Sequence, residues 1–224
     1  MVGRARDPRP TLTADVAAFR VKDDRMEVLL VERRHAPFRG DWALPGGFVA
    51  ADEEPEAAAR RELSEETGVV AATLRLFGVF GRPGRDPRGH TVTCAYQALF
   101  PPPAPEPVAG DDAAAARWWP ASAPPQLAFD HADVLAAALA FLQREATLGL
   151  AAFDLLPPRF SIEALRHVYQ AIAGHPIGAD VFAHRIRLYG ILQDAETPAA
   201  GESRLYRLAP GSARLLALQS PLSF

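Results

Sequence analysis

The stretch GFVAADEEPEAAARRELSEETGV, from Gly47 to Val69, constrains this chain more than any other part of its sequence. It places three carboxylates, Glu62, Glu65 and Glu66, within five consecutive residues. On a helix that advances about 3.6 residues per turn they stand at i, i+3 and i+4, so their side chains emerge from one face. Like charges so placed destabilise a helix by about 0.2–0.5 kcal/mol per pair. A divalent cation bound by these carboxylates would offset their repulsion, so the spacing suggests a metal-binding site.

The residues around these carboxylates predict where the helix begins and ends. Pro55 suits the first helical position, because the N–H that it lacks would be unpaired there anyway. Gly68 supplies a C-terminal stop, since glycine adopts the left-handed conformation that ends many helices. We therefore expect an alanine-rich helix from Pro55 to Thr67. Taken alone, its RELSEE segment also fits a solvated helix face with an Arg61–Glu65 salt bridge.

The composition indicates a globular, soluble protein. The chain has 224 residues, 49% of them apolar, which suffices for one ordinary domain and a small second one. No run approaches about 18 uninterrupted apolar residues, and the N-terminus carries charge and proline where a signal peptide would be apolar. We therefore expect a cytoplasmic protein without membrane contact. The single cysteine, Cys94, excludes an intrachain disulfide framework and is expected to be a buried structural thiol. The net charge of −3 lacks the basic balance of a dedicated nucleic-acid binder.

A first domain of strands and helices is expected over residues 11–149, after a disordered N-terminus of residues 1–10. Apolar and β-branched segments predict its strands, and a hairpin turn over residues 22–25 joins the first two. Asp130 is a suitable N-cap for a second helix. The strands are expected at Thr11–Val21, Met26–Glu32, Leu74–Gly81, Thr91–Phe100 and Ala116–Trp119, and the second helix at about Ala132–Thr147.

A second domain of different character is expected over residues 150–224. Two segments have apolar residues at helical spacing, the first with Ser161 as its N-cap and the second ended by Gly190. Two β-like segments then flank a polar, glycine-containing loop. Helix, helix and hairpin in this order are the outline of a winged helix-turn-helix. The helices are expected at Ile162–Ala173 and about Ala179–Tyr189, and the strands at residues 191–193 and 203–208.

The residues from Gly47 to Val69 spell G-x5-E-x7-R-E-apolar-x-E-E-x-G-apolar without a departure, so the first domain closely resembles the Nudix hydrolase family. The full pattern strongly disfavours the alternative of a merely solvated helix face. The resemblance implies the α/β class, with an α/β/α sandwich around a mixed sheet. It also implies cleavage of a nucleoside diphosphate linked to another group, with Mg²⁺ or Mn²⁺ required.

The resemblance assigns roles to the residues of the motif. Glu62 and Glu66 are expected to bind the metal directly, and Glu65 is expected to share that role. Carboxylate oxygens of this kind are the ligands that Mg²⁺ prefers. Further residues are expected to contribute a backbone carbonyl or to orient the carboxylates, namely Gly46 for the carbonyl and Arg61 and Glu53 for the orientation.

The general base stays open at this point. In related enzymes it can lie outside the motif. Three acidic residues in the loop after the last long strand are candidates: Glu106, Asp111 and Asp112.

Substrate-binding residues are expected before the motif and in a later loop. Three arginines in the preceding loop suit phosphate oxygens, although a solvated loop is an equal alternative. Trp42 or Phe38 is suited to stack on a base, with core packing the favoured alternative for Trp42. His35 and His90 are expected to be ordinary surface histidines. The arginines of the preceding loop are Arg33, Arg34 and Arg39, and the later loop adds Arg88.

Two segments, HAPFRGDWALPGGFV and GRDPRGHTVT, look like those of Nudix proteins that handle ADP-ribose. The whole chain in turn resembles the Nudix-related transcriptional regulators of NAD metabolism. In that family the first domain senses ADP-ribose and the winged helix binds operator DNA as a homodimer. The resemblance is softer in the second domain, where an acidic Glu202 at the tip of the wing would repel phosphate. The residues expected to contact DNA are His184, Arg185, Arg187 and Arg204.

Two hypotheses follow from the sequence. The first is a metal-dependent hydrolase of ADP-ribose or a related nucleoside diphosphate derivative, with the winged helix as an appendage. The alternative is an ADP-ribose-responsive, DNA-binding transcriptional repressor that uses the Nudix fold as a sensor. Intact motif carboxylates favour the first, and the two activities can coexist.

Overall fold

The computed structural model describes residues 9–110, 113–195 and 204–212. Most of the N-terminus expected to be disordered lies outside these residues, and so do Asp111, Asp112 and Glu202. The chain divides into two compact units. The first comprises residues 1–19, 28–98 and 105–138, and the second comprises residues 20–27, 99–104 and 139–224. The domain boundary expected near residue 149 stays a prediction.

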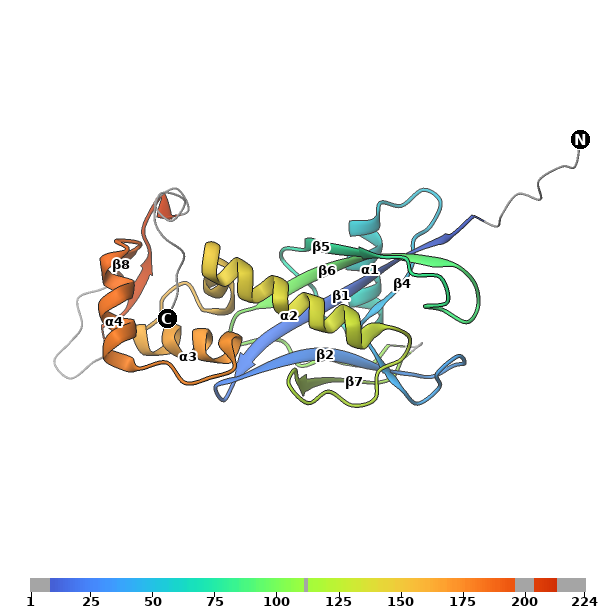
Figure 1. The fold of residues 1–224 in the computed structure, drawn as a ribbon, viewed down its shortest axis with the longest axis horizontal. Coiled ribbons are helices and arrows are strands. Elements are labelled where there is room, and N and C mark those ends of the chain that lie inside the picture. The colour runs from blue at the N-terminus through green and yellow to red at the C-terminus, as the bar shows by residue number, and fades with distance from the viewer. Residues whose placement is uncertain (1–8, 111–112, 196–203, 213–224) are drawn as a thin grey trace, which may run out of the picture. The chain divides into compact units, whose positions relative to one another are not determined.

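The N-terminal part of the chain forms a seven-stranded sheet with helices on both faces (Figure 1). Its elements are β1 (Thr11–Lys22), β2 (Arg25–Arg33), β3 (Trp42–Ala43), β4 (Gly46–Phe48), α1 (Pro55–Thr67), β5 (Arg75–Phe80), β6 (Thr91–Phe100), β7 (Ala113–Pro120) and α2 (His131–Leu148). The strand order is β3-β2-β1-β6-β5, with β4 paired to β1 and β7 paired to β2. The predicted α/β class is confirmed.

The central strand β1 is buried along most of its length. Residues 13–20 are all buried, as expected for a strand that is covered on both faces. The predicted hairpin to β2 is present, and its turn residues Asp23 and Asp24 both have positive φ. The short strands β3 and β4 are not among the strands that the sequence predicts. Antiparallel pairing places Gly46 opposite Asp15, and this register brings the motif's first glycines to the middle of the sheet.

Helix α1 begins and ends where the sequence predicts. Pro55 lies in its first turn, and Gly68 caps its C-terminus in the left-handed conformation at φ 68°, donating its N–H to the carbonyl of Ser64. Small and apolar side chains make the buried face, so the charged residues between them point elsewhere. The buried residues are Ala58, Ala59, Leu63 and Thr67.

The C-terminal part of the chain contains a 3-10 helix over Ala151–Leu155, then α3 (Ile162–Ala173), α4 (Ala179–Leu188), β8 (Leu192–Asp194) and β9 (Tyr206–Leu208). Ser161 caps α3 as predicted, because its side chain accepts a hydrogen bond from the N–H of Ala164 at 3.0 Å. Strands β8 and β9 pair in antiparallel fashion. The predicted order of helix, helix and hairpin is therefore confirmed, while the wing turn over residues 196–203 lies outside the described part of the chain.

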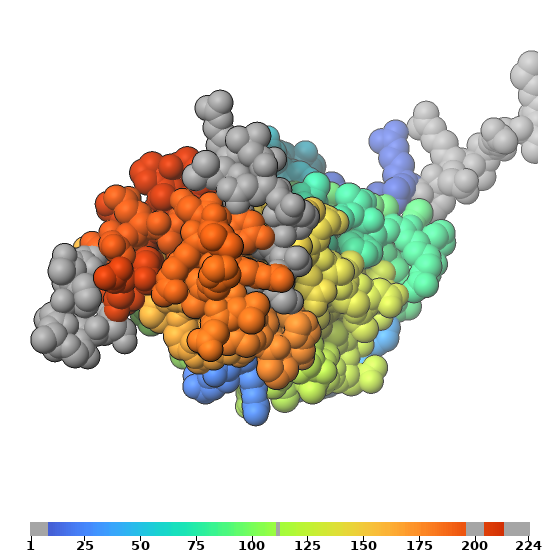
Figure 2. Space-filling model, turned by 60° about the vertical axis from the view of Figure 1, so that its left-hand side comes forward, coloured from blue at the N-terminus to red at the C-terminus, as the bar shows by residue number. Residues whose placement is uncertain are grey.

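Helices α3 and α4 pack on each other through aromatic side chains. The ring centroids of Tyr169 in α3 and Phe182 in α4 lie 5.5 Å apart. Ile186, which follows Phe182 in α4, is fully buried. Both helices contribute to one continuous surface, seen in orange in Figure 2. Among the described residues, no helix has both the length and the apolar character needed to cross a membrane.

Candidate active site

A cavity of about 460 Å³ opens in the first unit. Residues from strands β1 to β4, helix α1, the loop before β6 and the segment before α2 line it. The Gly47–Val69 motif contributes Gly47, Phe48, Arg61, Glu62 and Glu66 to this lining. The sheet therefore places the motif beside segments that are far from it in sequence.

Glu66 is the most strongly perturbed carboxylate of the cavity. It accepts a hydrogen bond from the N–H of Gly46, with 3.0 Å between nitrogen and oxygen. Burial raises the pKa of Glu66 to about 8, and the nearby negative charges of Glu62 and Asp15 act in the same direction. Burial also raises the pKa of Glu62. The cavity thus holds carboxylates whose ionisation is unfavourable until a positive charge arrives.

Two glycines precede helix α1 at positions where neighbouring carboxylates leave no room for a side chain. A Cβ atom on Gly47 would lie 2.4 Å from a carboxylate oxygen of Glu62, and one on Gly46 would lie 2.4 Å from Oδ1 of Asp15. A real side chain at either position would therefore displace a carboxylate of the cavity. This explains why glycine occupies both positions 46 and 47, ahead of helix α1.

Arg61 ties the motif loop to the helix. Its guanidinium donates to both carboxylate oxygens of Glu53 at 2.9 Å, to Glu62 at 2.7 Å and to Glu65 at 3.0 Å. The hydrogen bonds with Glu53 and Glu62 raise the pKa of Arg61. Glu53 also accepts from the N–H of Ala50. The arrangement orients the carboxylate of Glu62 toward the cavity, the kind of role expected for Arg61 and Glu53.

Glu65 lies apart from the other two motif carboxylates. Its side chain is 60% exposed and it does not line the cavity. The reason is geometric, because successive residues of a helix are turned by about 100° and Glu65 is therefore well separated from Glu66 around the axis. The structure brings together Glu62 and Glu66 at the cavity and leaves Glu65 on its outer side.

A divalent metal fits this donor set. Hard cations take oxygen ligands, which Glu62 and Glu66 present next to the backbone of Gly46. Burial raises the pKa of both carboxyls, so a cation that replaces the lost hydration would favour their ionised forms. No three His, Cys, Asp or Glu side chains in the described part of the chain already surround one point as a metal cage. Water and substrate oxygens would therefore complete the coordination.

Arg33 and Arg88 bring positive charge to the same cavity. Nε of Arg33 donates to the carbonyl of Pro37 at 2.8 Å, while its Nη atoms hydrogen-bond to no other described residue. Burial lowers the pKa of Arg33, and the charge of Arg88 lowers it further. Arg88 is held by Asp86, to which Nε and Nη2 donate at 3.0 Å and 2.7 Å. An anion bound between the two guanidiniums would relieve their repulsion.

The other expected substrate residues differ in position. Arg34 lines the cavity and donates to the carbonyl of Ala113 at 2.9 Å. Arg39 is exposed and does not line the cavity. Trp42 does not line it either, and its ring packs edge-on against Trp119 with centroids 5.1 Å apart. Of the two histidines expected at the surface, His35 is exposed at the cavity rim and His90 is exposed beside the carbonyl of Gly81.

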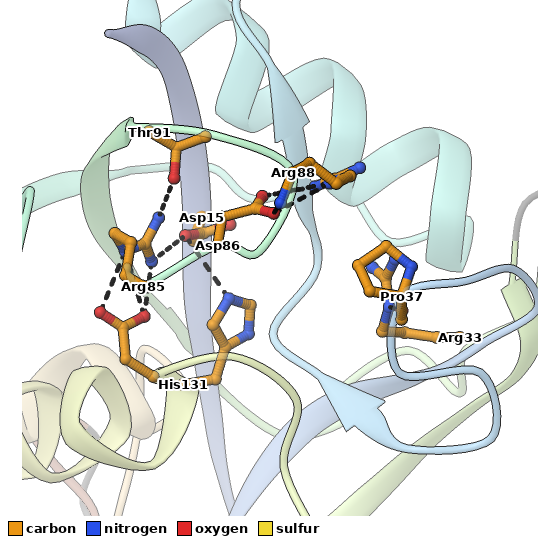
Figure 3. Close-up of polar contacts among 9 residues, drawn as sticks. Asp15, Arg33, Pro37, Arg85, Asp86, Arg88, Thr91 and His131 are labelled. Carbon is orange, nitrogen blue, oxygen red and sulfur yellow. Dashed lines mark hydrogen bonds and ion pairs between the residues drawn. The ribbon is translucent and has the colours of Figure 1, made fainter. Parts of the chain in front are cut away.

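Sequence reasoning missed a buried charged network beside the cavity (Figure 3). Arg85 donates to Asp130 at 2.7 Å and 3.0 Å and lies 3.7 Å from Asp15. Nε2 of His131 lies 3.8 Å from the same Asp15 oxygen. Asp130 had been expected only as a helix cap. The available signal was Asp15 itself, because a carboxylate inside an otherwise apolar strand needs charged or polar partners.

His131 has a defined tautomer in this network. Its Nδ1 accepts a hydrogen bond from the N–H of Leu44 at 3.0 Å, so the ring proton lies on Nε2, toward Asp15. Burial lowers the pKa of His131, which keeps the ring neutral. The residues at the start of α2 thus link several parts of the cavity wall. His131 bonds to the backbone of Leu44, and the neighbouring Asp130 pairs with Arg85.

The residues expected to contact DNA lie on the second unit. His184, Arg185 and Arg187 are exposed on α4 and are spread over the surface that the buried Phe182 and Ile186 do not occupy. The other expected residue, Arg204, is exposed near β9, with Nη1 3.8 Å from Asp194.

Comparison with known proteins agrees with this organisation. The NUDIX domain family matches residues 11–138, and the NrtR DNA-binding winged helix domain family matches residues 152–208. The ADPR responsive transcriptional repressor NtrR of Acinetobacter baylyi is 32% identical over 90% of this chain and 83% of its own length. The ADP-ribose pyrophosphatase of Methanocaldococcus jannaschii is 41% identical over 51% of this chain and 65% of its own length.

A solved structure extends the similarity to the whole fold. Shewanella oneidensis NrtR complexed with a 27mer DNA superposes on this chain with a TM-score of 0.73 and 32% identity. The match covers 91% of this chain and 95% of that chain. The family resemblance and the winged helix that the sequence indicated are confirmed.

Proposed function

Because the chain belongs to the Nudix family and carries an NrtR-type winged helix domain, we propose that it hydrolyses ADP-ribose or a closely related nucleoside diphosphate derivative. The observation that carries the proposal is the composition of the cavity. Two carboxylates suited to a divalent metal, Glu62 and Glu66, share it with two guanidiniums, Arg33 and Arg88. A diphosphate carries the negative charges that both a bound metal and the arginines would neutralise.

Each residue of the cavity has a distinct part in this proposal. Arg33 and Arg88 hold the oxygens of the diphosphate, while the N–H of Gly46 and the guanidinium of Arg61 fix Glu66 and Glu62. Glu62 and Glu66 would hold Mg²⁺ or Mn²⁺, which would supply Lewis acidity toward the phosphate oxygens and toward a water. Glu65 supports Arg61 from the outer side and is proposed as a positioning residue rather than a ligand.

Two relatives support ADP-ribose as the ligand. The Acinetobacter baylyi relative is a repressor responsive to ADP-ribose, and the Methanocaldococcus jannaschii relative is an ADP-ribose pyrophosphatase. ADP-ribose also suits the cavity chemically, because it presents one diphosphate between two ribose units. The general base is left unassigned, since Glu106 is exposed outside the cavity lining and the other two candidates lie beyond the described residues.

A second function is favoured by the surface of α4. This helix, the second of a helix-turn-helix arrangement, exposes an imidazole and two guanidiniums, with Arg185 and Arg187 directed to different sides of its exposed surface. Such a helix commonly enters the major groove of DNA, and dimers bind paired half-sites. We therefore propose that a homodimer of this protein also binds operator DNA, with ADP-ribose as its effector.

One turnover assay tests the enzymatic proposal. The purified protein is incubated with Mg²⁺ and separately with ADP-ribose, NADH, diadenosine polyphosphates or nucleoside triphosphates. We expect ADP-ribose to be converted with the highest kcat/KM. Preferential turnover of a nucleoside triphosphate would reject the proposed substrate.

A binding assay tests the second proposal. Genomic DNA fragments are mixed with the protein at low salt and the retained fragments are sequenced. We expect the retained fragments to share a palindromic site. Added ADP-ribose is expected to release these fragments from the protein. Failure to retain any fragment at low salt would reject operator binding and leave the hydrolase proposal untouched.

A further inference from the structure

One aromatic ring contacts both arginines of the cavity. The guanidinium carbon of Arg33 lies 4.7 Å from the ring centroid of Phe129, and that of Arg88 lies 5.6 Å from it. Arg88 also lies 5.3 Å from the ring of Phe48. Phe129 lines the cavity, although nothing in the sequence marked it as a functional residue.

The ring opposes a repulsion that would otherwise separate the two guanidiniums. Like charges in a partly dehydrated cavity repel, and the charge of Arg88 indeed lowers the pKa of Arg33. The face of an aromatic ring carries partial negative charge and attracts a guanidinium. Arg88 has a second anchor in its hydrogen bonds to Asp86, whereas the side chain of Arg33 hydrogen-bonds only to the carbonyl of Pro37 among the described residues and feels the charges of Glu66 and Asp86 without a hydrogen bond. The position of Arg33 therefore depends more strongly on Phe129 than the position of Arg88 does.

The backbone holds the ring in an unusual place. Phe129 has φ 56°, in the left-handed region that residues with a Cβ rarely adopt. Such a conformation persists where neighbouring contacts over-determine it. In the residue before Phe129, the N–H of Ala128 donates to the carbonyl of Trp42 at 2.7 Å. On the other side Asp130 is paired with Arg85, and His131 accepts from the N–H of Leu44.

The ring is also enclosed by other rings. Phe38 meets it edge-on with centroids 4.8 Å apart, and the imidazole of His131 lies 5.3 Å away. Several parts of the cavity wall therefore fix this aromatic ring beside two cations. A core packing role alone does not account for this, because the guanidiniums face a cavity rather than the interior.

We infer that Phe129 is a positioning residue that holds Arg33 and Arg88 together as one binding site for the diphosphate of a nucleotide. The inference rests on the function proposed above and adds the element that preorganises its arginines. Without the aromatic face, the two guanidiniums separate and the diphosphate must draw them together when it binds.

The test is ligand binding in metal-free buffer with EDTA, measured by calorimetry. ADP-ribose is the full ligand, and inorganic pyrophosphate presents the anion without base or ribose. Phe129→Leu keeps an apolar side chain at the same backbone position but removes the aromatic face. We expect it to weaken both ligands about tenfold, from the strength of two partly desolvated cation–π contacts. Phe129→Tyr keeps the ring and is expected to bind both ligands like the wild type.

Phe80→Leu is the matched control. Phe80 is also partly buried and meets another aromatic ring, that of Phe77, with centroids 6.1 Å apart, but it does not line the cavity. The same substitution there is expected to leave pyrophosphate binding unchanged. If Phe129→Leu does not fold, replacement of Phe129 by pentafluorophenylalanine keeps the shape and reverses the charge distribution of the ring. The same tenfold loss is then expected.

A double-mutant cycle with Arg33→Ala separates this role from general packing. We expect the Phe129→Leu penalty on pyrophosphate binding to shrink strongly in the Arg33→Ala background. An undiminished penalty there, or equal binding by wild type and Phe129→Leu, overturns the inference. A wild-type protein that neither binds ADP-ribose in EDTA nor cleaves it with Mg²⁺ overturns the proposed function instead.

Discussion

The raised pKa of Glu66 predicts a stability that depends on both pH and metal. In the folded, metal-free protein the carboxyl of Glu66 keeps its proton up to a pKa of about 8, against an ordinary value of 4.5 in the unfolded chain. Between these two pH values the folded state holds one more proton than the unfolded state. The free energy of unfolding therefore falls as pH rises through this window.

The size of the effect follows from the same two values. One unit of pKa corresponds to ~1.4 kcal/mol, so the full difference sets an upper bound of ~5 kcal/mol. Glu66 lines a cavity that water enters, and solvation there reduces the penalty for its charged form. We therefore expect a loss of roughly 2 kcal/mol between pH 5 and pH 8, or about 4–8 °C in Tm for a protein of this size.

The assay is thermal unfolding from pH 5 to pH 8, in EDTA and in MgCl₂, for the wild type and Glu66→Gln. Glutamine keeps the acceptor for the N–H of Gly46 and removes the titrating proton. In EDTA the wild-type Tm is expected to fall relative to that of Glu66→Gln as pH rises. Mg²⁺ should reverse this fall, because it binds the ionised carboxylate. Parallel pH profiles for the two proteins in EDTA would refute the reasoning.

Three further predictions concern other parts of the chain. Arg61→Ala removes the links to Glu53 and Glu62 and should reduce kcat for ADP-ribose roughly 10- to 100-fold, while Arg61→Lys should recover part of it; an unchanged kcat contradicts the positioning role. Gly47→Ala places a Cβ within 2.4 Å of Glu62 and should weaken Mg²⁺ binding measured by calorimetry, whereas alanine at the open Gly178 should not. Arg185→Ala should weaken operator binding and lower its salt slope by about 1, and an unaltered slope would argue against a phosphate contact.

Local signals in the sequence predicted local structure well. Pro55 and Gly68 marked the ends of α1, and Ser161 marked the start of α3, because each acts on the backbone of its own helix. The periodicity of apolar residues likewise located the two helices of the winged helix domain. Such features depend on neighbours within a few residues, which the sequence displays directly.

Long-range features of the candidate site were not predictable in the same way. The pairing of Arg85 with Asp130 joins residues 45 positions apart, and Asp15 is more distant still. The outward position of Glu65 depends on which side of α1 faces the sheet, which the i, i+3, i+4 spacing leaves undecided. Phe129 was missed because its importance arises from two arginines that only the fold brings to it.

The central claim is that Glu66 serves metal-dependent cleavage of a diphosphate in the cavity. Its most direct test is ³¹P NMR of ADP-ribose incubated with Mg²⁺ and either the wild type or Glu66→Gln. We expect the diphosphate signals of ADP-ribose to give way to the phosphomonoester signals of AMP and ribose 5-phosphate with the wild type alone. Intact ADP-ribose with the wild type, or equal cleavage by Glu66→Gln, would contradict it.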